Sequence, residues 1–359
     1  MKKWLLSLCM VLALVACKDE KKGTEQAKAK PVIKIGVSLP LTGDMGNIGA
    51  VLKGSVDIAQ QDLMARNLKN QYQFVIEDHA FDIKKVVLVN QKLLTVDKVD
   101  AIIDFASKIG LVTSPIAEQN KIIHISSCAS DPQVAEGKYN FIHWTQTADE
   151  TKKLVEKIIK EGLDNIVIFT AVDQATLEIS TNLQNLLKEH GIAFKEIRTN
   201  PKETDLNLIL NTVSAENTGL YVLLEYSPTL DIILKRLKEH ENTVPVTSIE
   251  TFSFLDNKDV VEGYWFVDAA ELSNDNYERF TSYNKSENIF GVGNTYDAIM
   301  LLVDAFEKAD TKEQAVEKLS EIKTYHGVVG KLHQDEKGIF NSEAILKKIV
   351  DGKVIKIED

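Results

Sequence analysis

From residue 32 onward, short apolar runs alternate with segments whose apolar residues recur at helical spacing. A short apolar run followed by a helix suits a strand that is buried on both faces, as in a parallel sheet. Parallel strands need a long crossover, usually a helix, so the alternation predicts β-α-β units. In the first series we expect strands at 32–37, 74–76, 101–103 and 122–125, with helices over 51–63, over 86–94 and from 108.

The same rhythm begins again after a loop. The second series comprises a helix at 151–159, a strand at 166–169, a helix at 177–187, a strand at 220–224, a helix at 230–240 and a strand at 244–249. Two consecutive series predict an α/β protein with two doubly wound parallel sheets. The last third adds helices at 295–308 and 312–322 and a mostly β tail with a strand at 354–357.

The first residues do not share this pattern. Lys2 and Lys3 precede an apolar run over residues 4–16, in which Ser7 is the polar exception. The run is shorter than the roughly 20 residues that cross a bilayer, so it is typical of a signal peptide. It ends in LVAC, closed by Cys17, which resembles the bacterial lipoprotein processing box, where cleavage precedes a cysteine that receives lipid. A plain signal peptide with a chance cysteine is the alternative.

Residues 18–30 are rich in Lys, Glu, Ala and Gly and have no apolar stripe, so we expect a flexible tether. We assign 1–16 to a lipoprotein signal peptide and 17–31 to the lipid anchor and tether. If Cys9 leaves with the signal and Cys17 carries lipid, Cys128 has no partner for a disulfide. We therefore expect an exported fold that is stable through its cores alone.

Composition and motifs restrict the function. Of 359 residues, 44% are hydrophobic and 26% charged, which is a globular composition with enough apolar material for more than one core. The formal net charge of -11 provides no basic footprint, so we expect no nucleic-acid partner. The chain has no G-x-S-x-G, H-E-x-x-H, C-x-x-C or G-x-x-x-x-G-K-[ST] motif, so we predict neither an enzyme nor a cofactor.

Two local clusters have simple structural explanations. Gly43, Gly46 and Gly49 lie between a strand and a helix, but their spacing is not the dinucleotide fingerprint. We interpret them as turn glycines plus a close helix contact, with a phosphate site as the alternative. His79 has acidic neighbours, and a polar strand-to-helix loop explains this group better than a metal site.

Several motifs occur in a fixed order along the chain. They are IKIGVSLPLTG (33–43), AII (101–103), PIAE (115–118), ISSCASDP (125–132), TYDA (295–298), HGVVGK (326–331) and DEKG (335–338). Together they resemble the type I periplasmic solute-binding proteins of the branched-chain amino acid transporter family. The resemblance covers nearly all of residues 32–350, and the ordered set is more specific than any single motif.

The resemblance implies two α/β lobes, joined by three crossovers, that close on a ligand between them. This agrees with the rule that open α/β sheets bind ligands beyond the carboxyl ends of their strands. We place the crossovers near 141–147, 267–272 and 330–334. The N-terminal lobe then comprises 32–143 plus 271–330, and the C-terminal lobe 144–270 plus 331–359.

The resemblance places one half of the ligand site on the N-terminal lobe. Ser107 and Lys108 stand where a helix begins, and free backbone N–H groups there attract a carboxylate. A simple N-cap is the alternative. Cys128 and Ser130 match positions that offer a backbone group and a hydroxyl to the ligand carboxylate, although Cys128 could equally be a small buried filler.

The other half of the site belongs to the C-terminal lobe. Glu225 and Tyr226 follow the strand at 220–224, and Glu250 follows the strand at 244–249. Glu250 matches the family's acid that receives an α-ammonium group, with a solvated rim charge as the alternative. Tyr226 matches a pocket aromatic, with ordinary packing as the alternative.

The chain departs from the family pattern at several of these positions. Ile48 and Ala175 stand where the family has aromatic residues, and Asp104-Phe105 stands where it often has Gly-Pro. With Lys108 and Glu225 added, these changes point to a ligand other than leucine or valine. An amino acid derivative, an amide or a small carboxylate fits this interpretation.

We therefore expect a lipid-anchored extracytoplasmic protein, in the periplasm or at the cell surface, that acts as a monomer. Its small-molecule ligand, an amino acid or similar polar compound, would pass to the membrane permease of an ABC importer. A ligand sensor or a regulator of an envelope enzyme on the same fold is the alternative. A hydrolase would need a nucleophile–base pair facing the cleft, and the sequence supplies no obvious one.

Overall fold

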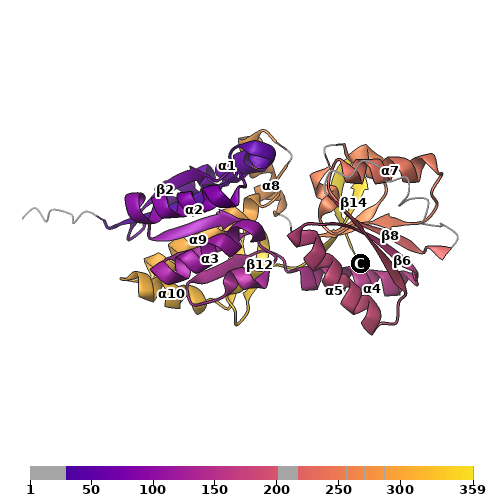
Figure 1. Cartoon of the computed structure of the whole chain (residues 1–359). Coiled ribbons are helices and arrows are strands. Elements are labelled where there is room, and N and C mark those ends of the chain that lie inside the picture. Colours follow the sequence, from indigo (N-terminus) through magenta and orange to yellow (C-terminus); the bar gives the residue numbers. More distant parts are fainter. Residues whose placement is uncertain (1–29, 201–216, 256, 271, 287, 359) are drawn as a thin grey trace, which may run out of the picture. The chain divides into compact units, whose positions relative to one another are not determined.

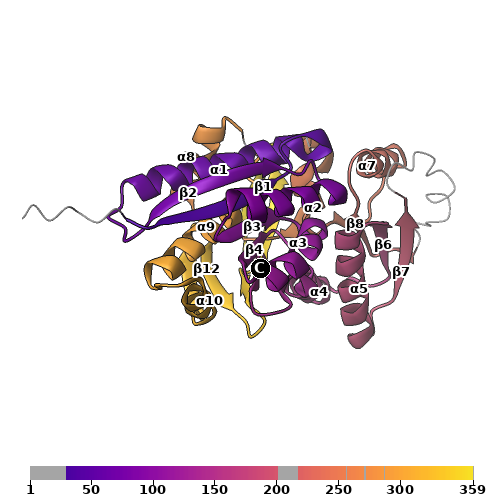
Figure 2. The same ribbon diagram turned by 60° about the vertical axis from the view of Figure 1, so that its left-hand side comes forward.

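The two predicted series of β-α-β units form two sheets with separate hydrophobic cores (Figures 1 and 2). The protein is seen in a computed structural model that describes residues 30–200, 217–255, 257–270, 272–286 and 288–358. The expected signal peptide, Cys17 and nearly all of the tether lie outside these residues and stay predictions. Within the described ranges, no helix combines the length and apolar character that crossing a bilayer requires.

The larger sheet belongs to the N-terminal lobe and has the strand order β2-β1-β3-β4-β5-β13-β12-β11. The first six strands in this order are mutually parallel, and β12 and β11 continue the sheet antiparallel. The bounds are β1 Val32–Leu39, β2 Gln71–Asp78, β3 Ala101–Phe105, β4 Ile123–Ser127, β5 Asn140–His143, β11 Thr324–Gly327, β12 Gly330–Gln334 and β13 Ile339–Asn341.

Helices cover both faces of this sheet because its central strands are apolar on both sides. In β3, Ile102 packs under α2, whereas Ile103 faces the core that α1 and α9 share. Helix α3 lies beside α2, and α8 and α10 lie with α1 and α9 (Figure 2). The bounds are α1 Gly46–Met64, α2 Ile83–Lys92, α3 Ser107–Asn120, α8 Asn274–Asn284, α9 Val292–Glu307 and α10 Lys312–Ser320, with short helices η1 Gly43–Met45, η2 Leu93–Asp97 and η3 Pro132–Ala135.

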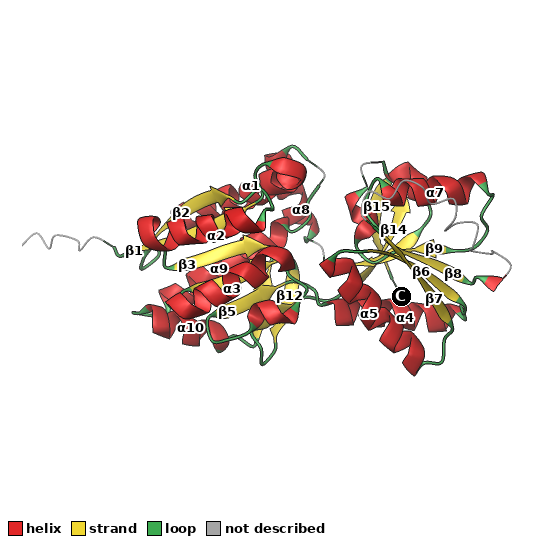
Figure 3. Ribbon diagram, in the orientation of Figure 1, coloured by secondary structure: helices red, strands yellow, loops and turns green. Residues whose placement is uncertain are grey.

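The C-terminal lobe has a parallel sheet, β7-β6-β8-β9, and an antiparallel one, β10-β14-β15, linked by a parallel bridge between Ile249 and Val267 (Figure 3). Ile168 on β6 packs with α4 and α5, and Phe169 faces the core that contains α7. The bounds are α4 Thr147–Glu161, β6 Ile166–Ala171, α5 Gln174–Glu189, β7 Phe194–Thr199, β8 Leu220–Leu224, α7 Thr229–Glu239, β9 Val246–Thr247, η5 Thr251–Phe254, η6 Lys258–Val261, β10 Trp265–Asp268, β14 Ile345–Val350 and β15 Lys353–Ile357.

The predicted α/β class is confirmed, and two of the details that differ from the expectation concern the sheets. Strand β7 has no counterpart in the prediction, because it is an edge strand in which charged residues interrupt the apolar ones. Strands β12 and β13 pair within the larger sheet, so the third crossover follows Asn341 rather than lying at 330–334. Residues 331–341 therefore belong with the N-terminal lobe, because their backbone hydrogen bonds complete its sheet.

The close contact expected at the glycine cluster is present at Gly49. A Cβ atom built there would collide with the carbonyl oxygen of Pro40, which is backbone and cannot turn away. We expect Gly49→Ala to lower the free energy of unfolding by about 1–3 kcal/mol, as overpacking does. Gly46→Ala, on the same helix, is the matched control, because its Cβ would lie 3.3 Å from the Leu41 carbonyl. Urea denaturation measures both variants, and equal losses would contradict this explanation.

Candidate ligand-binding site

Three residues with a left-handed backbone mark the carboxyl ends of parallel strands. Ala106 follows β3 with φ 74° and ψ 151°, and Cys128 follows β4 with φ 59°. Glu250 has φ 61° and ψ -41°, just beyond β9. Such conformations cost on the order of 1–3 kcal/mol each for residues other than glycine, and they gather at binding and catalytic sites. The strained backbone therefore marks the same edges at which an open α/β sheet binds ligands.

Ser107 joins the two loops of the N-terminal lobe. Its Oγ accepts hydrogen bonds from the backbone N–H groups of Ser130, at 2.9 Å, and Asp131, at 3.1 Å. The hydroxyls of Ser107 and Ser130 lie 3.3 Å apart, and both side chains are buried. Within the described part of the chain, no side chain caps the first turn of α3. The predicted pair of serines is therefore brought together at an uncapped helix N-terminus, where a polar ligand group can accept hydrogen bonds.

Lys108 and Cys128 face different surroundings from the two serines. The Lys108 ammonium donates to the carbonyl oxygen of Phe81 at 3.1 Å and lies 4.6 Å from the centroid of that ring. The Cys128 side chain is buried, and a Cβ atom at Gly291 would lie only 2.6 Å from its sulfur. Burial, together with the nearby charge of Glu250, raises the pKa of the Cys128 thiol, so this group stays neutral.

Glu250 belongs to a group of three carboxylates that we call the hinge acid cluster: Glu150, Glu250 and Asp268. Their carboxylate oxygens lie within 4.8 Å of one another. The Trp144 indole donates to Glu250 at 3.0 Å, and Lys347 forms an ion pair with Asp268 at 2.9 Å. Glu150 follows the first crossover, in α4, and Asp268 ends β10, where the second crossover begins.

The cluster holds more negative charge than its one lysine can balance. Burial and the charge of Asp268 raise the pKa of Glu250 to about 7, against the hydrogen bonds from Glu150 and Trp144. Burial and the charge of Glu250 raise the pKa of Glu150 well above its ordinary value. Glu150 is fully buried, and neither of its carboxyl oxygens accepts a hydrogen bond from a described donor. A proton on Glu150 that is donated to Glu250 relieves this charge.

Glu178 on α5 lies between the two lobes and is a site residue that the sequence analysis missed. Its carboxylate accepts a hydrogen bond from Thr147 at 2.9 Å and a long one from Ser130 at 3.5 Å. Burial chiefly, and then the charge of Asp131, raises the pKa of Glu178 to about 7 despite the Thr147 hydrogen bond. In sequence it is one glutamate on the polar side of an amphipathic helix, and nothing in that pattern distinguishes it.

A cavity of about 450 Å³ opens beside Glu178. Gln174, also on α5, donates to the carboxylate of Asp131 at 2.7 Å, so side chains of both lobes meet here. The lining consists of Asp131, Pro132, Gln133, Gln146, Thr147, Ala148, Gln174, Glu178 and Asn182. All of these residues are polar except one proline and one alanine, so the cavity suits a polar ligand.

Glu225 and Tyr226, directly after β8, are the other two predicted site residues of the C-terminal lobe. The Glu225 carboxylate accepts a hydrogen bond from Thr199. Burial, with a contribution from Asp173, raises the pKa of Glu225 to about 7 against that bond. The pKa of Tyr226 is raised by burial and then by the charges of Asp173, Glu250, Glu225 and Glu150. Tyr226 therefore lies within electrostatic reach of the predicted acids.

Aromatic rings connect the two lobes. Tyr226 packs against Phe254, with ring centroids 5.8 Å apart, and Phe254 packs against Phe290 at 4.5 Å. Phe290 in turn meets Trp144 at 5.2 Å. These rings supply aromatic surface that the positions of Ile48 and Ala175 lack, and they come from loops and the short helix η5, where no local pattern identifies them.

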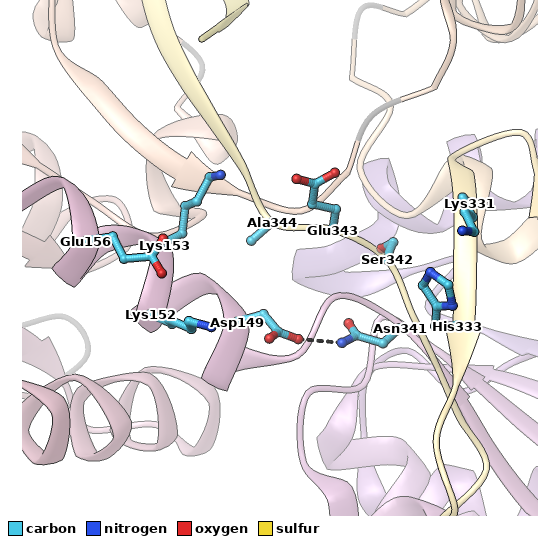
Figure 4. A pocket seen from close by; sticks show the side chains of 10 residues that line it. All are labelled: Asp149, Lys152, Lys153, Glu156, Lys331, His333, Asn341, Ser342, Glu343 and Ala344. Atoms are coloured by element: carbon cyan, nitrogen blue, oxygen red, sulfur yellow. Dashed lines mark hydrogen bonds between the residues drawn. The ribbon is translucent and has the colours of Figure 1, made fainter. Parts of the chain in front are cut away.

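A second hollow, of about 400 Å³, lies between α4 and the third crossover (Figure 4). An Asn341–Asp149 hydrogen bond spans it, as the dashed line in Figure 4 shows. Its lining mixes Lys152, Lys331 and His333 with Asp149 and Glu156, so it favours neither sign of charge.

The raised pKa values have a consequence for stability. The pKa values of Glu178, Glu225 and Glu250 are about 7 in the folded protein, whereas the pKa of glutamate in an unfolded chain is about 4.3. Between these values the folded protein holds protons that the unfolded chain has released, so stability falls as the pH rises through this window. We expect the wild-type Tm to fall between about pH 5 and pH 7.5. The Tm of a variant in which Glu178, Glu225 and Glu250 are all replaced by Gln should fall by less over the same range. Differential scanning calorimetry on both proteins measures this difference, and parallel curves would contradict it.

Comparison with known proteins assigns the family. The family model for periplasmic binding proteins matches residues 32–353, so the chain belongs to the periplasmic binding protein family. The resemblance seen in the sequence motifs is thereby confirmed.

Solved structures of the same fold come from several bacteria. The leucine-binding protein LivK of Thermotoga maritima MSB8 has a TM-score of 0.81 and 22% identity, covering 91% of this chain and 98% of its own. A solute-binding protein of Rhodopseudomonas palustris BisB5, in complex with 3,4-dihydroxybenzoic acid, has a TM-score of 0.78 and 16% identity, with 91% and 96% covered. LivJ of Streptococcus pneumoniae, in complex with isoleucine, has a TM-score of 0.77 and 18% identity, with 91% and 100% covered.

Proposed function

We propose that this chain is the lipid-anchored, extracytoplasmic solute-binding component of an ABC importer, and that it binds a small polar ligand between its two lobes. One observation carries the proposal: polar side chains of both lobes meet, because the Ser130 hydroxyl, which lies beside Ser107 on the N-terminal lobe, donates to Glu178 on α5 of the C-terminal lobe at 3.5 Å. A ligand that contacts both sets stabilises the closed arrangement, because the open one offers it half of these contacts.

The neighbouring structures support a small ligand without naming it. Solved structures of this fold are complexes with leucine, isoleucine or 3,4-dihydroxybenzoic acid, three compounds that share a carboxyl group. The uncapped start of α3 and the two serine hydroxyls beside it offer a place for such a group. A binding role, rather than catalysis, agrees with the family to which the chain belongs.

A thermal-shift screen of the full-length chain, purified in mild detergent, tests the binding role. The panel contains amino acids, amides, amines and small carboxylic acids. A compound present at about 100 times its Kd should stabilise the fold by about 2.7 kcal/mol. At least one member should raise the Tm in a concentration-dependent way. A panel without any such compound would favour a regulator of an envelope enzyme on the same fold.

The anchor makes a separate prediction. We expect Cys17 to carry lipid, and a multiply acylated cysteine binds a bilayer stably, whereas one short chain binds only marginally. Cys17→Ala should therefore abolish processing at this position and lipid labelling of the mature protein. Mass spectrometry of the mature N-terminus and membrane fractionation are the measurements. A soluble mature wild-type protein that begins at another residue would refute the anchor.

A further inference from the structure

Helix α2 and the adjoining η2 carry apolar side chains on their outer face as well as on their inner one. On the inner face, Val89 and Leu93 pack in a buried cluster with Ile102 of β3. Four other apolar side chains are exposed, and we call their surface the α2 outer face: Ile83 (48% exposed), Val87 (44%), Leu88 (65%) and Val96 (69%). An exposed apolar surface of this kind marks a contact with another protein or with a membrane.

The α2 outer face ends beside the point at which the predicted tether joins the fold. Just before α2, the N–H group of His79 donates to the carbonyl oxygen of Leu39, at the carboxyl end of β1. At the other end, the Lys34 ammonium donates to the carbonyl oxygen of Asp97, the last residue of η2, at 3.1 Å. Side chains alternate along a strand, so the exposed Val32 lies on the same side of the sheet as Lys34 and η2.

The predicted lipid is close to this face along the chain. Fourteen residues separate Cys17 from Pro31. A flexible segment of that length spans about 20 Å on average, and it spans at most about 50 Å when it is fully extended. The ten residues of α2 and the five of η2 are together about 23 Å long. The anchor therefore keeps the whole face within reach of the bilayer, where even a weak affinity for lipid suffices.

Exposed lysines surround the α2 outer face: Lys84, Lys85, Lys92 and Lys98. Lys92 pairs with Glu77 at 2.6 Å and with Asp97 at 2.9 Å, whereas the other three form no ion pair with an acid in the described ranges. Lysine is depleted in interfaces between proteins. Aliphatic side chains beside lysines are instead typical of a helix that lies on a membrane surface.

We propose that the α2 outer face lies on the bilayer to which the chain is anchored, with its aliphatic side chains in the headgroup region. The surrounding lysines extend along this apolar surface and place their ammonium groups at the lipid phosphates. The inference goes beyond the proposed binding function and rests on the anchor predicted at Cys17. This contact holds the N-terminal lobe against the membrane in which the proposed permease resides.

Spin labelling of the mature lipidated chain in vesicles of phosphatidylethanolamine and phosphatidylglycerol tests the inference. Lipid blocks Cys17 and Cys128 is buried, so Leu88→Cys supplies a single site for the label. Met64→Cys is the matched control, because Met64 is 75% exposed and ends α1, on the opposite face of the same sheet. A water-soluble nickel chelate should collide with the label of Leu88→Cys at least threefold less often than with that of Met64→Cys, and oxygen should collide with it more often.

A second reporter separates the apolar contact from a chance protection at one position. With the label on Val96→Cys, the added substitutions Ile83→Glu and Leu88→Glu should restore access of the nickel chelate, whereas Met64→Glu should leave the protection unchanged. All three substituted side chains are exposed, so the fold should be retained, and circular dichroism checks this. In vesicles of phosphatidylcholine alone the protection should be weaker, because the lysines lose their anionic partners.

Three results would overturn the inference, and each is distinguishable from the others. If the chain does not float with the vesicles, the anchor fails together with the inference. If the anchored chain leaves the labels of Leu88→Cys and Met64→Cys equally open to the nickel chelate, the bilayer contact is wrong and the face belongs to a protein partner. If the label of Met64→Cys is the protected one, the opposite face of the lobe lies on the membrane. In the last two cases the anchor and the proposed binding function stand.

Discussion

Replacing Glu250 with alanine should reduce ligand affinity by a hundredfold or more. In the closed site an ammonium group on Glu250 is cut off from water, and removing one partner of a buried charge pair costs about 3–5 kcal/mol. By the relation between free energy and Kd, that loss exceeds a factor of about 100. Glu150, in the same cluster, is fully buried, so it does not replace Glu250 as a partner for the ligand.

Two further variants give this prediction a sharp test. Glu250→Gln retains an oxygen for the Trp144 indole and removes the charge, so it should lose almost as much affinity as alanine. Glu241→Ala, exposed and beyond the end of α7, should bind as the wild type does. Calorimetric titration with the best compound from the thermal-shift panel measures all three. Wild-type affinity in Glu250→Ala would show that the ligand has no ammonium group at this position.

Replacing His124 should destabilise the protein by about 3–5 kcal/mol, because it strands a buried carboxylate. His124 Nε2 lies 3.1 Å from Asp104, and both side chains are 0% exposed. Its other ring nitrogen lies 3.0 Å from the Asn140 side-chain oxygen. Burial alone would raise the pKa of Asp104, but the interaction with His124 holds it below its ordinary value.

This pair contributes stability in a defined pH range. The folded pKa of Asp104 lies below that of the unfolded chain, so the stabilisation is present above about pH 4 and is lost as the pH falls further. Urea denaturation at neutral pH should therefore show the full loss in His124→Ala. The double variant Asp104→Asn/His124→Ala should lose less than His124→Ala, because no charge is left unpaired. His240→Ala, an exposed histidine, should stay within about 0.5 kcal/mol of wild type. A loss below about 1 kcal/mol in His124→Ala would refute the pair's role.

The central strands of both lobes can be predicted from the sequence, but the boundary between the two lobes cannot. The runs at 101–103 and 220–224 are apolar on both faces and lie in the centre of their sheets, where no polar face interrupts the pattern. Strand β12, by contrast, exposes the polar side chains of Lys331 and His333, and its pairing with β13 assigns it to the N-terminal lobe. Such pairing depends on residues far apart in the chain, which a local pattern does not record.

The candidate site likewise contains residues that could be predicted from the sequence and residues that could not. Ser107 and Ser130 were predictable because each follows a clear strand, and parallel strands end at one edge. Glu178, the Phe254–Phe290 contact and the left-handed Ala106 were not predictable. Their roles depend on which surfaces of two lobes meet and on a backbone conformation that alanine rarely adopts.

Small-angle scattering with and without ligand tests the central claim, that a small molecule binds between the two lobes, most directly. The measurement uses the compound from the panel with the largest thermal shift, at saturation. Because that ligand contacts both lobes only when they are closed, it should shift the population toward the closed form and reduce the radius of gyration. The Glu250→Ala variant at the same ligand concentration should keep the larger radius. A wild-type radius that does not change at saturation would contradict the two-lobe clamp.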